Sequence, residues 1–298
     1  MDSEGERLVK AVMDVNLADP VSRARARQAA ESLVSDHVTE AKSRMLARRF
    51  RALVEADAGG AQIAEDLERL AARLRQLDPH YTGKSGALRR LFKRKEDRAQ
   101  RFVAAREDFK TITDSLSRSS AVLRQNSVAL EAFEVDAAAE ARQVAANIER
   151  ADALSATLSA SIRDAKLAAE KADVVSFAER EVLIPLEEHR QHLQSLRAVN
   201  QQMLFSLAML RETNAALIQN IQQITLATRG ILAATSLRTT PDGPASEDLS
   251  LNDSLEELSR ALDAHTAWRK ENLAKRSEAL QELQNLSSEA FGSSDYVS

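Results

Sequence analysis

The chain has 298 residues and a formal net charge of −4, and it is 44% hydrophobic and 29% charged but only 4% aromatic. With eight glycines and five prolines, this composition is typical of long amphipathic helices. The acidic balance excludes a surface built throughout for nucleic acid. The absence of cysteine excludes disulfides, thiolate metal sites and a cysteine nucleophile.

The N-terminal sequence MDSEGERLVKAVMD lacks the basic and apolar order of a signal peptide. The longest strongly apolar run, residues 204–210, is far shorter than the roughly 18 to 20 residues that span a bilayer. We therefore expect a cytoplasmic protein.

Residues 1–78 are predicted to form N-terminal helices. A short helix is expected over residues 4–16. Asp19 is a good N-cap and Pro20 a good first helical residue, so a long second helix is predicted to run from there to about residue 56.

Gly59 and Gly60 interrupt this pattern, and an amphipathic helix is predicted over residues 61–77. A loop is expected at 79–86, because the residue before a proline disfavours helical geometry and the segment also contains glycine.

Residues 87–237 are predicted to be a core of very long helices. Serines at 115–120 compete for backbone hydrogen bonds and could break the helix there, and the pattern weakens at 171–177. Pro185 marks a helix start or a kink.

The sequence after this core contains two prolines and a glycine, and it predicts a loop at 238–248. A last helix is expected at 249–286, in which the single tryptophan, Trp268, packs against the bundle. A disordered tail is predicted at 287–298. Together these elements predict an all-α fold, an elongated antiparallel bundle of amphipathic helices with coiled-coil-like seams.

Residues 182–231 carry a heptad seam, in which apolar residues recur in alternating steps of four and three. Three polar residues occupy this seam at intervals of two heptads: Asn200, Asn214 and Thr228. Buried amides at such positions hydrogen-bond across a helix interface and fix its register. The alternative is that these side chains line a polar groove for a ligand.

Several segments of the chain, taken in order, resemble those of a known family. LRETNAALIQNIQQITLATRGILAA, which begins at Leu210, resembles the signature helix of the TelA/KlaA toxic-anion (tellurite) resistance family. Upstream, RLRQLDP, GALRRLF and LRQNSVALEAF follow the order of the family's middle section, so the resemblance covers roughly residues 40–286. It implies an all-helical cytosolic protein that acts in resistance to tellurite and other toxic or envelope-directed stresses.

Residues 88–106 form a basic segment with eight basic and two acidic residues, a net charge of +6. Apolar residues accompany the charges, so the segment could bind an anionic membrane surface or an acidic protein. An ordinary solvated helix face, or an anion or nucleic-acid site, are the alternatives. The candidate contact residues are Arg89, Arg90, Lys93, Arg94, Lys95, Arg98 and Arg101.

His189 and His192 are three residues apart on one predicted helical face, a spacing that could ligate a metal ion. The HExxH arrangement is absent, and a packing or pH-sensitive role is the alternative that the spacing favours. The sequence has no GxSxG, GxxxxGK[ST] or GxGxxG motif, so neither a catalytic residue nor a cofactor is predicted.

We therefore expect a non-enzymatic resistance protein that contacts other proteins or the inner membrane surface through residues 88–106. Without cysteine it cannot reduce tellurite by its own thiols. It could form a homo-oligomer, and nucleic-acid binding is not expected. One alternative is a self-assembling scaffold that remodels membranes, and another is a metal-dependent hydrolase centred on His189 and His192.

Overall fold

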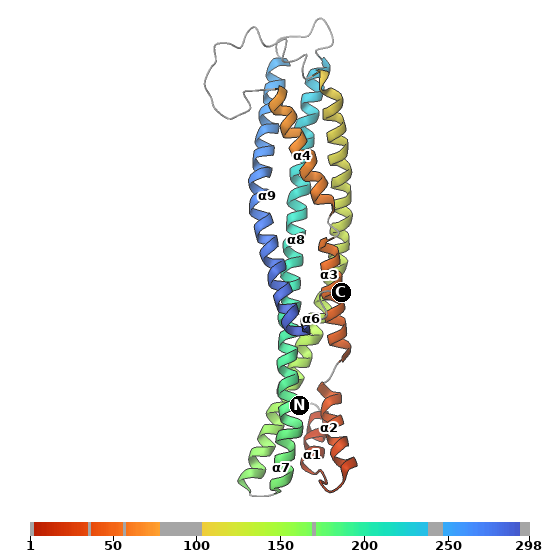
Figure 1. Ribbon diagram of the computed structural model, residues 1–298, viewed down its shortest axis with the longest axis vertical. Helices are drawn as coiled ribbons and strands as arrows, with labels where there is room; N and C mark the ends of the chain where they lie inside the picture. The colour runs from red at the N-terminus through yellow and green to blue at the C-terminus, as the bar shows by residue number, and fades with distance from the viewer. Residues whose placement is uncertain are drawn as a thin grey trace. The chain divides into compact units, whose positions relative to one another are not determined.

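The computed structural model describes residues 3–34, 37–55, 58–77, 103–168, 171–237 and 247–292, and every regular element in these stretches is a helix (Figure 1). The prediction of an all-α helical bundle is confirmed. The predicted loop at 79–86, residues 238–246 of the second predicted loop and most of the basic segment lie outside the described residues. The last two residues of the second loop, 247 and 248, are helical, so the prediction is wrong there. Among the described helices, none combines the length and the apolarity needed to cross a membrane.

The chain divides into two compact units. Unit 1 comprises residues 1–52, 133–206 and 279–298, and unit 2 comprises residues 53–132 and 207–278. Long helices contribute to both units, so each unit is assembled from segments far apart in the sequence.

Two short helices begin the chain, α1 (Ser3–Met13) and α2 (Pro20–Val34). Asp19 is the N-cap of α2, as predicted. Its Oδ1 accepts a hydrogen bond from the backbone N–H of Val21 at 2.9 Å, and its Oδ2 accepts one from Ser22 at 3.2 Å.

The predicted single helix from 20 to 56 is wrong, because α2 ends at Val34 and α3 (His37–Glu55) follows it. Residues 35 and 36 are serine and aspartate, which favour helix starts over helix interiors. The next helix, α4 (Ala58–Leu77), includes Gly59 and Gly60 in its first turn. Helix α4 therefore begins before the two glycines and not after them.

Helix α6 (Arg106–Leu167) is continuous, so the break considered at 115–120 does not occur. The serines there are accommodated within the helix. Ser117 donates to the carbonyl of Thr113 at 2.9 Å, and Ser115 donates to Asp66 at 2.6 Å. The buried Leu116 anchors the same turn.

After α6, Lys171 adopts a left-handed conformation with φ of 49° and precedes α7 (Ala172–Phe177). A π-helix, η2 (Ala178–Leu183), leads into α8 (Ile184–Leu237). Pro185 thus lies at the start of α8, which is one of the two outcomes predicted for it. The turn before it is already widened, since the backbone N–H of Ile184 donates to the carbonyl of Glu179 five residues back, and Pro185 follows with no N–H to donate.

Helix α9 (Glu247–Phe291) extends beyond its predicted end, so the prediction of a disordered tail is wrong for residues 287–291. Ser287, Ala290 and Phe291 are buried, and the guanidinium of Arg44 lies 5.4 Å from the centre of the Phe291 ring. Burial of these side chains stabilises the helical conformation of residues 287–291. Residues 293–298 lie outside the described residues.

Unit 1 has antiparallel helix pairs. Residues 43 and 50 of α3 lie beside residues 140 and 133 of α6, so their numbers run in opposite directions. One core cluster joins α1 and α2 to α6, α7, η2 and the first turns of α8. Arg27 of α2 pairs with Glu181 at 2.6 Å and lies over the ring of Phe177.

Unit 2 has its own core, formed by α4, the first part of α6, the last part of α8 and α9. Asp66 and Arg73 of α4 contact Ser115 and Asp108 of α6, so this pair is also antiparallel. Trp268 packs against the core cluster, as expected.

Gly230 marks a close approach of α8 to α9 in unit 2. A Cβ at this position would lie 2.8 Å from Oγ of Ser254. Alanine is more favourable than glycine in a helix by about 1 kcal/mol, but the contact opposes that gain. We expect Gly230→Ala alone to leave the free energy of unfolding nearly unchanged. The double variant with Ser254→Ala should raise it by about 0.5 to 1 kcal/mol relative to Ser254→Ala alone in urea unfolding. A decrease in the double variant would contradict this.

Candidate functional site

The predicted seam of α8 is buried along its length, except at His189, which is half-buried. The seam therefore packs against neighbouring helices in each unit. Of its three polar residues Asn200, Asn214 and Thr228, only Asn200 belongs to unit 1, and the three lie in different surroundings.

Asn200 is completely buried and contacts two other helices through a chain of polar groups. Its Nδ2 donates to Oγ of Ser43 at 3.2 Å, and the Ser43 hydroxyl donates to Oε1 of Glu140 at 3.2 Å. Nζ of Lys42 lies 3.0 Å from Oε2 of the same carboxylate. Because the Glu140 side chain is only 1% exposed, these contacts stabilise a charge that burial alone would disfavour.

A second set of amides continues this arrangement. Asn147 donates to the hydroxyl of Thr39 at 3.3 Å and accepts from Gln143 at 3.1 Å. We call the buried polar residues of this region the polar layer: Thr39, Ser43, Glu140, Asn147 and Asn200. It joins α3, α6 and α8 within unit 1, and Oδ1 of Asn200 has no hydrogen-bond partner among the described residues.

Asn214 and Thr228 belong to unit 2. Asn214 is 7% exposed, and the Thr228 hydroxyl donates to the carbonyl of Ile224 in its own helix at 2.7 Å. Thr228 therefore satisfies its hydroxyl without a partner helix. Among the described residues, Asn200 is therefore the one of these three whose side chain hydrogen-bonds to another helix.

The two histidines lie near one another on α8, with ring centres 6.4 Å apart. Nε2 of His192 is 3.5 Å from Oε2 of Glu40 on α3. Within the described ranges, no group of three or more histidine, aspartate or glutamate side chains is arranged to hold a metal ion. His192 therefore links α8 to α3 in unit 1 through Glu40.

The basic contact residues from Arg89 to Arg101 lie outside the described residues. Arg106, the last residue of the basic segment, begins α6 and is exposed. Glu107 and Asp108 follow it in the first helical turn, where negative side chains interact favourably with the helix dipole.

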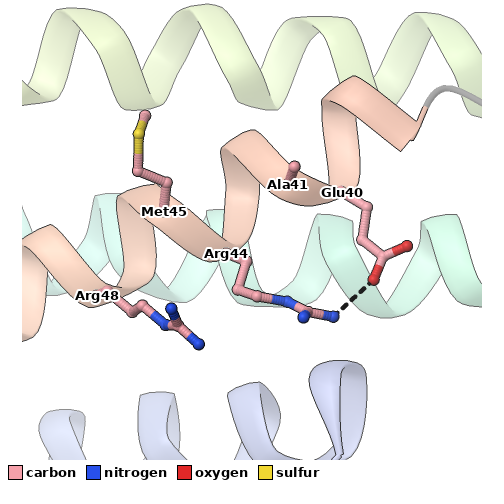
Figure 2. A pocket seen from close by; sticks show the side chains of 5 residues that line it. All are labelled: Glu40, Ala41, Arg44, Met45 and Arg48. Atoms are coloured by element: carbon pink, nitrogen blue, oxygen red, sulfur yellow. Dashed lines mark hydrogen bonds and ion pairs between the residues drawn. The ribbon is translucent and has the colours of Figure 1, made fainter. Parts of the chain in front are cut away.

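A shallow groove of about 340 Å³ lies on the outward side of α3 in unit 1. Figure 2 shows Met45 extending toward α6, whereas Arg44 and Arg48 project on the side of α9. Ala41 and Glu40 lie further along the helix and complete the lining, and Glu40 pairs with Arg44 at 2.8 Å. The groove therefore combines an apolar floor with charged side chains.

Unit 2 contains a buried histidine that the sequence did not single out. His265 is 5% exposed, its ring centre lies 5.6 Å from that of Trp268, and its Nδ1 has no hydrogen-bond partner in the described part of the chain. Burial, and to a lesser degree the charge of Arg269, lower the pKa of His265 from 6.5 to about 4.

This shift predicts a pH dependence of stability. The unfolded chain binds the proton near pH 6.5 and the folded chain only near pH 4, so acid favours unfolding between these values. Between pH 7 and pH 4.5, the free energy of unfolding of the His265→Gln variant should fall by about 2 kcal/mol less than that of the parent protein. Urea unfolding at several pH values measures this difference, and parallel curves for the two proteins would contradict it.

The fold and the site define a helical-bundle protein whose apolar seams are interrupted by buried polar groups. The family model for toxic anion resistance proteins (TelA) matches residues 34–237, which is more than half of the chain. The chain therefore belongs to the TelA family. The match includes the polar layer and the groove and ends at the last residue of α8, before the predicted limit of 286. Comparison with curated proteins and with solved structures gave no match.

Proposed function

We propose that this protein acts in toxic-anion resistance without catalysing a reaction, by contacting other proteins or the inner membrane surface from the cytoplasmic side. Membership of the TelA family supports the role in toxic-anion resistance. The mode of action is inferred from the charge pattern of the chain.

The observation that carries this mode is the charge contrast. The basic segment has a net charge of +6, whereas the whole chain has a net charge of −4. Each basic residue near an anionic membrane contributes about 1 kcal/mol of attraction, so several together support reversible binding. Leu88, Leu91, Phe92 and Phe102 add apolar side chains that an interfacial helix could bury.

The test compares the growth of a tellurite-sensitive bacterial host that carries no protein, the intact chain, or a variant with a neutralised basic segment. This variant has four substitutions: Arg89→Gln, Arg90→Gln, Lys93→Gln and Arg94→Gln. We expect protection from the intact chain and its loss in the variant.

A matched control removes the same amount of charge from exposed arginines of α6: Arg118→Gln, Arg124→Gln, Arg142→Gln and Arg150→Gln. It should protect as well as the intact chain. Equal protection by the neutralised variant would overturn the role of the basic segment, and no protection by any chain would overturn the tellurite phenotype itself.

Sedimentation with anionic vesicles separates the two kinds of contact. Binding at low salt that weakens at high salt and in the neutralised variant supports the membrane surface. If resistance requires the basic segment but vesicles do not bind, a protein contact is supported instead.

A further inference from the structure

Helix α3 has an apolar stripe on its outward face, opposite the polar layer. Val38, Ala41 and Met45 are exposed at steps of three and four residues, and Ala52 continues the row. Val38 is 73% exposed and Met45 48% exposed. This spacing places the four side chains on one face of the helix, as in the seam of a coiled coil.

The opposite face of α3 is fixed in unit 1. Ser43, Leu46 and Phe50 are completely or almost completely buried against α6 and α8. The helix therefore presents its outward stripe from a packed position, and little conformational entropy would be lost when a partner binds.

The stripe also contains the groove described above. Ala41 is the small residue of its lining, and the larger side chains of Glu40, Arg44 and Met45 lie beside it along the helix (Figure 2). A small residue flanked by larger ones is the shape that accepts a side chain from a second helix.

Basic residues flank the stripe on both sides. Helical spacing places Arg44 and Arg51 along one edge and Lys42 and Arg49 along the other. Lys42 and Arg49 each lie within 4 Å of a carboxylate of α6, yet their side chains remain 44% and 54% exposed. With five basic and two acidic residues, α3 has a net charge of +3 in an acidic chain.

We propose that the outward face of α3 is a docking surface for an acidic amphipathic helix of a partner protein. Apolar residues of that helix would cover the stripe, and its flanking carboxylates would pair with the basic residues at both edges. The stripe is narrow and includes a concave groove, which suits a helix better than a flat lipid surface. This interface is distinct from the basic segment and does not depend on the proposed function.

The test uses the full chain and a labelled synthetic peptide of about three heptads, with leucine at the core positions and glutamate at the flanking positions. A second peptide carries lysine in place of each glutamate. Fluorescence anisotropy should show binding of the acidic peptide and binding of the lysine peptide at least about tenfold weaker.

The variant Ala41→Glu/Met45→Glu places charge on the stripe and should weaken binding of the acidic peptide at least about tenfold. The control variant Val21→Glu/Phe205→Glu changes two exposed apolar residues on other helices of unit 1 and should bind as the parent does. Circular dichroism checks that both variants retain the parent's helical content. The neutralised basic-segment variant should also bind, which separates this proposal from the proposed function.

Several results would overturn the proposal. Equal affinity for the two peptides would exclude charge complementarity, and unchanged binding by Ala41→Glu/Met45→Glu would place the peptide elsewhere. If this variant instead loses binding to anionic vesicles while neither peptide binds the parent, the surface binds lipid. If light scattering shows a dimer that only this variant dissociates, the occupant is a second copy of the chain.

Discussion

Replacing Phe50 by alanine is expected to lower the free energy of unfolding by about 3 to 5 kcal/mol, the range measured for buried aromatic residues. The Phe50 side chain is completely buried in unit 1, and its ring centre lies 6.1 Å from that of Phe133. Removal of the Phe50 side chain leaves a cavity and ends its tilted contact with the Phe133 ring. The guanidinium of Arg49 lies over the same Phe133 ring, 5.5 Å from its centre.

Urea unfolding followed by circular dichroism measures this loss. Phe205→Ala is the matched control, because Phe205 is a phenylalanine of the same unit that is 61% exposed. Its replacement should change the free energy of unfolding by no more than about 0.5 kcal/mol. Similar losses for the two variants would contradict the packing described for Phe50.

Replacing Glu140 by alanine should lower the free energy of unfolding by about 2 to 3 kcal/mol, the upper part of the range for a buried donor left without its acceptor. The change leaves the buried Ser43 hydroxyl without its acceptor and removes the charged partner of Lys42. The half-exposed Lys42 can turn toward water, which limits the loss.

Glu140→Gln is the conservative comparison, since it keeps an oxygen for Ser43 and should lose only about 1 kcal/mol. A double-mutant cycle with Ser43→Ala should give a coupling free energy of about 1 kcal/mol or more, because the two side chains are in contact. Strictly additive losses would show that the hydrogen bond between them contributes little to stability.

The sequence predicts the helices and the α8 seam well, because buried residues recur at a regular spacing that can be counted along a single sequence. The same spacing marks Glu140 and Asn147 in α6, where Phe133, Ala137 and Val144 continue the row in steps of four and three. Counting along that helix could have identified both polar residues. Their partners could not be predicted, since Ser43 and Glu140 are 97 residues apart and their contact depends on how α3 pairs with α6.

Local boundaries were predicted less well for a related reason. The serine-rich composition of the tail predicted disorder. Phe291 is nevertheless buried near Arg44, and this burial depends on tertiary packing that the composition does not reveal. The depressed pKa of His265 likewise results from its surroundings in unit 2, which no short motif encodes.

The π-helix before α8 determines how far an insertion or deletion would rotate the preceding helix. A π-turn holds more residues than an α-turn, so deleting one residue between Ala178 and Leu183 could restore α-geometry without breaking the helix. The shortened chain would keep α7 close to its present orientation relative to α8, because the wide turn holds one residue more for nearly the same rotation. If the same residues instead adopted α-geometry with none deleted, α7 would turn by about 100°, the rotation of one helical residue. Phe177 would then leave the guanidinium of Arg27, and the face of α7 that covers α1 and α2 would point elsewhere. The π-helix therefore acts as a phase adjustment between two packing surfaces that a uniform α-helix of this sequence could not align.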